Sequence, residues 1–108
     1  MNDKKVKIKV QHFEGCPNSK EIIARVKTAI TEFGNNIEYE EILVETPEEA
    51  ERVKFRGSPT VLINGIDLEN MPEPIEAILA CRYYKNGLPS IIQIKEFITE
   101  QLKKEEYL

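Results

Sequence analysis

Residue types that support several common functions are scarce in this chain. It has two cysteines and one histidine among 108 residues. Two cysteines are too few for the disulfide framework of a small secreted domain, and in a reducing compartment we expect both to be thiols. Together with one histidine they cannot supply the four ligands of a tetrahedral zinc site. We therefore expect no structural metal and no resident cofactor.

Long apolar runs and an excess of positive charge are also missing. No apolar stretch is long enough for a signal peptide or a membrane span. The 15 lysines and arginines are interleaved with 19 aspartates and glutamates, and the formal net charge is -4. This balance argues against a nucleic-acid surface. We expect a cytoplasmic protein with neither a membrane nor a nucleic-acid partner.

What is present fits one domain that spans residues 1–108. The content is 41% hydrophobic and 31% charged, which supports one core and leaves no room for a second. The chain shows no internal repeat and no low-complexity linker. We therefore treat it as a single folding unit.

The first half of the chain alternates strand and helix patterns. Apolar and polar residues alternate over 6–10, which predicts a strand with one apolar face. Apolar residues at helical spacing predict an amphipathic helix over 17–33. Residues 37–44 are apolar and β-branched but interrupted by glutamates, so they predict a second strand near an edge. A capping-box pattern then predicts a short helix over 46–54.

The second half begins with a hairpin pattern and ends with a helix pattern. Residues 61–68 are two apolar runs around Asn-Gly, the sequence that favours a two-residue hairpin turn. Residues 69–74 are too broken by proline for regular structure. Apolar residues over 75–81 predict one or two helical turns, and 82–87 predict a loop. A second capping box predicts a last helix from residue 90, with a frayed end.

A cysteine stands at the joint between the first strand and the first helix. Gly15 permits a tight turn, and Pro17 suits the first helical position because its missing N–H would be unpaired there. Cys16 therefore falls at the N-cap, at the positive end of the helix dipole. A thiolate is stabilised there, so we predict that Cys16 is more nucleophilic than an ordinary buried cysteine. The alternative is a purely structural N-cap.

The order strand, helix, strand, helix, hairpin, helix resembles the thioredoxin fold over nearly the whole chain. Residues 16–19 (Cys-Pro-Asn-Ser) stand where that fold carries Cys-x-x-Cys, and 58–60 (Ser-Pro-Thr) stand where it carries a cis proline. The resemblance implies an α/β thioredoxin-like fold (βαβαββα) with an insertion before the last helix. It also implies a cis peptide bond before the proline. The backbone platform that it implies for an extended substrate consists of Ser58, Pro59 and Thr60.

Four short motifs support a narrower resemblance. They are Phe-x-Gly-Cys-Pro-Asn at 13–18, Gly-Ser-Pro-Thr at 57–60, Asn-Gly-x-Asp at 64–67 and Cys-Arg-x-Tyr at 81–84. Together they resemble small bacterial thioredoxin-like proteins, some of which are labelled as related to alkylmercury lyase.

The chain departs from the oxidoreductase pattern at Ser19, which replaces the second motif cysteine. A dithiol cycle therefore cannot run within the motif, and we expect Ser19 to donate a hydrogen bond to the Cys16 thiolate. The connection over 69–88 is unusually long and contains Cys81. We hypothesise that Cys81 approaches Cys16 closely enough to be its resolving thiol or a second soft-metal ligand. The alternative is that Cys81 packs as a small buried hydrophobe.

Other candidate side chains carry weaker signals. Arg82 would stabilise the thiolate or bind an anionic substrate, unless it lies exposed in a polar loop. The lone His12 is more often a structural or solvated residue, so we predict no catalytic role for it. Asp67 fits a role in turn geometry.

The sequence thus predicts a thiol-dependent redox protein, acting in thiol–disulfide exchange or related thiol chemistry on a protein or a small thiol or disulfide. The alternative is a non-catalytic binding module for soft metals or a protein partner. A homodimer through the 37–44 edge strand is a further alternative. The predicted catalytic residues are Cys16, Cys81 and Ser19, and the predicted substrate-binding residues are Ser58, Pro59, Thr60 and Arg82.

Overall fold

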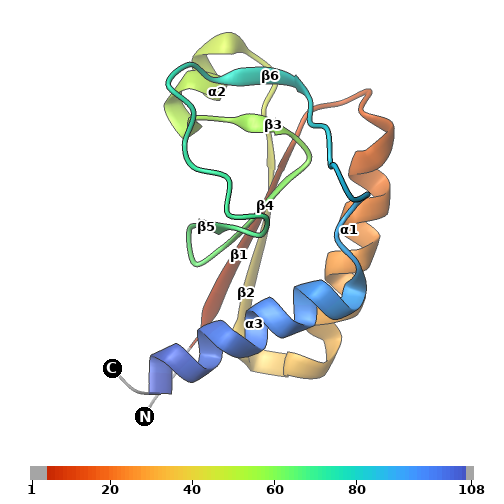
Figure 1. The fold of residues 1–108 in the computed structure, drawn as a ribbon, viewed down its shortest axis with the longest axis vertical. Coiled ribbons are helices and arrows are strands. Elements are labelled where there is room, and N and C mark those ends of the chain that lie inside the picture. The colour runs from red at the N-terminus through yellow and green to blue at the C-terminus, as the bar shows by residue number, and fades with distance from the viewer. Residues whose placement is uncertain (1–4, 107–108) are drawn as a thin grey trace.

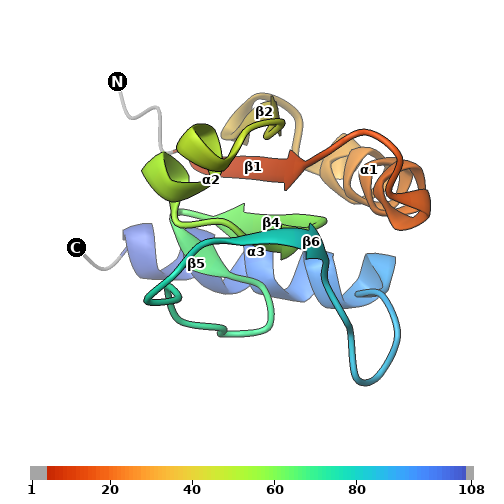
Figure 2. The same ribbon diagram turned by 90° about the horizontal axis from the view of Figure 1, so that it is seen from above.

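The structure, a computed structural model, describes residues 5–106, and a four-stranded sheet of order β2-β1-β4-β5 forms its centre (Figures 1 and 2). β1 (Val6–His12) pairs in parallel with β2 (Ile37–Leu43) and antiparallel with β4 (Thr60–Ile63). β4 turns into β5 (Ile66–Asp67), which pairs antiparallel with it. The hairpin and the edge position of β2 are as predicted.

Two long helices share one hydrophobic cluster with β1 and β4. α1 (Pro17–Ile30) ends earlier than predicted, because a 3-10 segment, η1 (Thr31–Asn36), follows it. α3 (Ile91–Glu106) continues through the residues predicted to fray. Within the described residues, no helix is long and apolar enough to cross a membrane. The fully buried core side chains of this cluster include Val6, Ile8, Val10, Ile22, Val26, Ile63, Ile94 and Ile98.

The short helix α2 (Pro47–Val53) begins as its capping signals predict. The backbone N–H of Glu49 donates to Thr46 Oγ1 at 3.1 Å, which satisfies one of the unpaired N–H groups of the first turn. Ala50 packs with Val44 and Phe55 in a second, smaller hydrophobic cluster. Figure 1 shows that α2 lies at the same end of the molecule as the strands described next.

The prediction of helical turns over 75–81 is wrong, because this stretch is extended. β6 (Ile78–Cys81) pairs in parallel with β3 (Arg56–Ser58) in a separate two-stranded sheet (Figure 1). Two 2.8 Å bonds join the segments, from the Ile78 N–H to the Phe55 carbonyl and from the Arg82 N–H to the Ser58 carbonyl. A short helical turn here would leave those carbonyls without these donors, and so short a turn is unstable by itself.

Gly57 permits the close approach of the two segments. Its φ is +101°, and a Cβ built at Gly57 would lie 2.9 Å from Arg82 Cβ and 3.2 Å from Arg82 Cα. A residue with a side chain would meet both a steric clash and an unfavourable backbone conformation. The glycine therefore lets the end of β6 reach the region around Cys16.

Candidate thiol site

Cys16 occupies the predicted position at the N-cap of α1. Its backbone is extended (φ -83°, ψ 115°), and Pro17 opens the helix after it. The residue is only 5% exposed. When protonated, its thiol donates to the Ser58 carbonyl, with Sγ 3.4 Å from the oxygen. The Ser58–Pro59 peptide bond is cis, as predicted.

The pairing of β6 with β3 brings the second cysteine to the first. Cys81 is the register partner of Ser58, and its Sγ lies 3.5 Å from Cys16 Sγ. Both cysteines are free thiols, and Cys81 is exposed. The hypothesised approach of the two cysteines is therefore confirmed, and the alternative of a buried, core-like Cys81 is wrong.

The two thiols differ in their tendency to ionise. Burial raises the pKa of the Cys16 thiol, but hydrogen bonds with Ser58, Asn18, Cys81 and Ser19 outweigh it and bring the pKa below its ordinary value. The hydrogen bond to Cys16, burial and the nearby Cys16 charge all raise the pKa of Cys81. The pair therefore holds its first negative charge on Cys16, while Cys81 keeps a proton that it donates to Cys16.

Two buried serines form hydrogen bonds that favour the Cys16 thiolate. Ser19 is 6% exposed and Ser58 is fully buried, and their hydroxyl oxygens lie 3.2 Å apart. Ser58 Oγ also accepts the backbone N–H of Phe13 at 3.2 Å. A hydrogen bond with Ser19 is among those that lower the pKa of Cys16, whereas the side chain of Ser58 turns inward to join this network.

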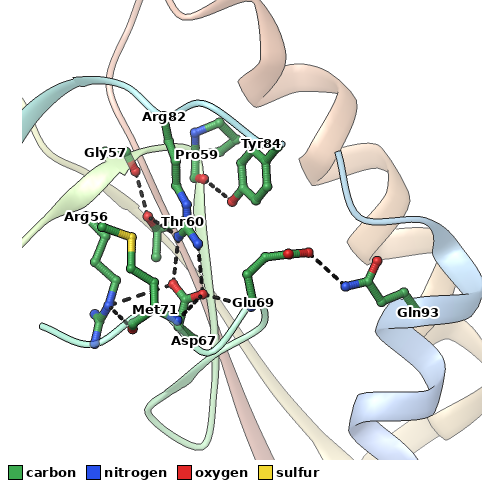
Figure 3. Close-up of polar contacts among 10 residues, drawn as sticks. All are labelled: Arg56, Gly57, Pro59, Thr60, Asp67, Glu69, Met71, Arg82, Tyr84 and Gln93. Atoms are coloured by element: carbon green, nitrogen blue, oxygen red, sulfur yellow. Dashed lines mark hydrogen bonds and ion pairs between the residues drawn. The ribbon is translucent and has the colours of Figure 1, made fainter. Parts of the chain in front are cut away.

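Residues 58–60 are bonded to the chain's own C-terminal half, and Figure 3 shows the contacts of Pro59 and Thr60. The Ser58 carbonyl accepts the Arg82 N–H, and the Pro59 carbonyl accepts the Tyr84 hydroxyl at 2.6 Å. Thr60 is buried, and its Oγ1 lies 3.3 Å from Arg82 Nη1, which donates to it. The platform implied by the thioredoxin resemblance is therefore engaged by residues 82–84.

Arg82 is part of a buried ionic cluster and does not lie exposed in a loop. Its guanidinium binds the Asp67 carboxylate with two bonds, Nη1 to Oδ2 at 2.6 Å and Nη2 to Oδ1 at 2.9 Å. It also lies over the Tyr84 ring, 4.7 Å from the centroid. Arg56 approaches the same carboxylate, with Nε 3.7 Å from Oδ2. Figure 3 shows the Arg82 guanidinium directed at Asp67, and Arg56 Nε between Asp67 and the Met71 carbonyl, to which it donates at 2.9 Å.

Asp67 is the centre of this cluster. Burial raises the pKa of its carboxyl, but hydrogen bonds from Arg82 and from the Glu69 N–H hold the pKa below its usual range. The bond from the Glu69 N–H to the Asp67 carboxylate agrees with the predicted role of Asp67 in turn geometry. The sequence pattern does not reveal Arg56 or the Asp67–Arg82 pair, because no spacing rule connects a hairpin carboxylate to an arginine in a long connection.

A cavity of about 340 Å³ lies beside Cys81. Its lining includes the exposed cysteine and side chains from three segments, β3, the start of the long connection and the stretch after β6. The charged residues and the cysteine of this lining are Arg56, Glu69, Cys81, Arg82 and Lys85.

The site offers two sulfur ligands to a metal. Over residues 5–106, no group of three or more histidine, cysteine, aspartate or glutamate side chains could hold a metal ion. A pair of thiolates can still bind a soft ion at low coordination number.

Comparisons with known proteins identify the fold. No protein-family model matches this sequence, and no curated protein matches it. Among solved structures, the chain is similar to the crystal structure of chloroplastic thioredoxin z, with a TM-score of 0.61. The two share 16% sequence identity, and the match covers 91% of this chain and 79% of that chain. The fold is thioredoxin-like.

Proposed function

We propose that this protein carries out thiol–disulfide exchange, with Cys16 as the nucleophile and Cys81 as the resolving thiol. The observation that carries the proposal is the 3.5 Å separation of the two sulfurs. The N-cap position of Cys16 and its lowered pKa supply the thiolate that exchange requires. The thioredoxin-like fold supports the same conclusion.

The exchange proceeds in two steps. The Cys16 thiolate attacks a disulfide R–S–S–R, forming Cys16–S–S–R and releasing RS⁻, which takes the proton of Cys81. The Cys81 thiolate then attacks Cys16 Sγ, forming the Cys16–Cys81 disulfide and releasing the second RS⁻. Two electrons pass from the cysteine pair to the substrate. Hydrogen bonds with the hydroxyls of Ser19 and Ser58 lower the pKa of Cys16 and so favour its thiolate before the attack.

The engaged platform favours small disulfides over extended protein segments. A peptide that bound along β3 would have to displace β6 and the bonds that Arg82 and Tyr84 make to the backbone at 58–59. A small disulfide needs no such displacement of a strand. We therefore place low-molecular-weight disulfides first within the predicted substrate class.

The test is to oxidise the reduced protein with one equivalent of bis(2-hydroxyethyl) disulfide and map the products by mass spectrometry. We expect loss of both thiols, a Cys16–Cys81 disulfide and two equivalents of mercaptoethanol. The Cys81→Ser variant should stop at a mixed disulfide on Cys16, and Cys16→Ser should react more slowly. A wild-type protein that accumulates the mixed disulfide without resolving it would contradict the proposal.

A second candidate function is soft-metal binding, which the paired sulfurs also favour. A binding module would lose both free thiols on titration with a monovalent soft ion and would not reduce a disulfide. The narrower bacterial resemblance, the cytoplasmic location and the homodimer through β2 stay predictions.

A further inference from the structure

We infer that the cavity beside Cys81 binds a small thiol that carries a negative charge, and that this thiol reduces the Cys16–Cys81 disulfide by attacking Cys81. The inference rests on the proposed thiol–disulfide exchange. It adds the chemical class of the reductant and the sulfur at which that reductant enters.

The first argument is access. Cys16 is 5% exposed at the base of α1, whereas Cys81 is exposed at the end of β6 and lines the cavity. A thiolate from solution that attacks a disulfide must reach one of its two sulfurs. Cys81 is the more exposed of the two sulfurs and the one that lines the cavity, so a thiol bound in the cavity meets Cys81 before Cys16.

The second argument is the leaving group. Attack on Cys81 expels Cys16 as a thiolate, and a leaving thiol with a lower pKa departs faster. Hydrogen bonds with Ser58, Asn18 and Ser19 favour that charge on Cys16. Attack on Cys16 would instead expel Cys81, whose pKa is raised. Access and leaving-group stability therefore select the same sulfur.

The third argument is the charge of the cavity lining. Arg56, Arg82 and Lys85 line the cavity, against the carboxylate of Glu69 and that of Asp67, which Arg82 binds. The cations outnumber the carboxylates by one. Glu69 is in addition directed to Gln93, whose Nε2 donates to it at 2.9 Å (Figure 3). The lining thus favours an anion.

Because the whole chain is negatively charged, a faster reaction with an anionic thiol would point to the cavity lining as its cause. The formal net charge is -4, so a long-range effect alone would slow an anionic reagent and speed a cationic one. Faster reaction with an anion must therefore arise at the cavity. Its volume of about 340 Å³ suits a small molecule.

The reduction balances with two equivalents of the thiol. The first RS⁻ attacks Cys81 Sγ, forming Cys81–S–S–R, breaking the bond to Cys16 and leaving the Cys16 thiolate. The second RS⁻ attacks the R sulfur of this mixed disulfide, forming R–S–S–R and releasing Cys81, which takes up a proton. Two electrons pass from the two thiols to the cysteine pair.

The experiment measures the reduction of the oxidised chain of residues 1–108 by three small thiols of different charge. The probes are 3-mercaptopropionate (anionic), 2-mercaptoethanol (neutral) and cysteamine (cationic), with each second-order rate constant divided by the thiolate fraction. We expect mercaptopropionate to react roughly threefold faster than mercaptoethanol at low salt, and cysteamine to react slowest. The expected difference is small because the cavity lining has only one excess positive charge, which water and salt partly screen. Added salt should reduce the difference.

A matched pair of variants locates the effect. Lys85→Gln removes a charge from the cavity and should abolish most of the advantage of mercaptopropionate. Lys103→Gln removes the same charge from α3, at a different surface cavity, and should leave the advantage unchanged. Acid-quenched samples should carry the mercaptopropionate adduct on Cys81.

The outcomes separate the inference from the proposed function. If mild oxidation gives no Cys16–Cys81 disulfide, both are overturned. If the disulfide forms but the three thiols reduce it at equal rates per thiolate, or the adduct lies on Cys16, the inference is overturned and the proposed function stands.

Discussion

A single hydroxyl group, that of Ser58, connects the thiol to the backbone before α1. Its oxygen accepts the Phe13 N–H and lies 3.2 Å from the hydroxyl of Ser19, and its hydrogen bond lowers the pKa of Cys16. The residue is fully buried, so water cannot replace these bonds without rearrangement. Loss of this hydroxyl should therefore affect both reactivity and stability.

Replacing Ser58 with alanine should raise the pKa of Cys16 and cost about 1–3 kcal/mol of unfolding free energy, because the Phe13 N–H loses a buried acceptor. The pKa is measured by the pH dependence of iodoacetamide alkylation, and stability by urea unfolding. Ser90→Ala is the control, because Ser90 accepts the Gln93 N–H at the start of α3. It should reduce stability and leave the alkylation profile unchanged. An unaltered profile in Ser58→Ala would contradict the role assigned to its hydroxyl.

The Asp67 carboxylate should make stability depend on pH. Its pKa is held below the ordinary value, chiefly by Arg82, against the effect of burial. Its contribution to stability is therefore present above the unfolded-state pKa of about 3.9 and is lost as pH falls through the lower folded pKa. We expect urea unfolding to show a steeper loss of stability below pH 4 in the wild type than in Asp67→Asn.

The same substitution should be costly at neutral pH. Asp67→Asn leaves the Arg82 guanidinium, whose side chain is 7% exposed, without its carboxylate, and breaking a buried pair costs about 3–5 kcal/mol. The double variant Asp67→Asn/Arg82→Gln removes both charges, so its loss should be smaller than the sum of the two single losses. Additive losses would show that the pair does not act as a unit.

At the scale of elements, the sequence predicts the features that depend on residues close together along the chain. The N-caps at Cys16 and Thr46 and the β4–β5 hairpin depend on residues within a few positions of one another, and all are present. β6 was mispredicted because its apolar residues fit helical spacing and its pairing partner, β3, lies more than 20 residues earlier. The Cys16–Cys81 approach could be inferred because topology returns the chain to that end of the sheet. Strand β6, which brings the two cysteines together, could not be inferred.

Docking of β6 should depend on the glycine opposite it. Gly57→Ala places a Cβ 2.9 Å from Arg82 Cβ at a φ of +101°, so we expect displacement of β6 and at least a tenfold slower formation of the Cys16–Cys81 disulfide under mild oxidation. Gly65→Ala is the matched control. Its φ is +81°, and nothing lies within 4 Å of the added Cβ.

The two glycine variants separate backbone strain from contact. Both should lower the free energy of unfolding, as measured by urea. Only Gly57→Ala should slow disulfide formation. Equal disulfide rates in the two variants would show that the β3–β6 contact does not bring the cysteines together.

At the scale of the whole molecule, a Cys16–Cys81 bond would join residues 65 positions apart. A crosslink over a loop of this length restricts the unfolded chain and stabilises the folded one by about 4 kcal/mol when the folded geometry is not distorted. We expect the oxidised protein to unfold at a higher urea concentration than the reduced protein. Equal midpoints would mean that the bond distorts the native arrangement around β6.

For the proposed thiol–disulfide exchange, the short sheet of β3 and β6 also has a consequence for the direction of electron flow. Docked β6 presents Cys81 to Cys16 at a high effective concentration, and a dithiol held ready to close is a stronger reductant. Weaker docking of β6 in the reduced state makes the disulfide less favourable and raises the reduction potential, by about 30 mV for each 1.4 kcal/mol. A change in one backbone contact, at a residue without sulfur, would thereby shift which thiol partners this protein can reduce and which can reduce it.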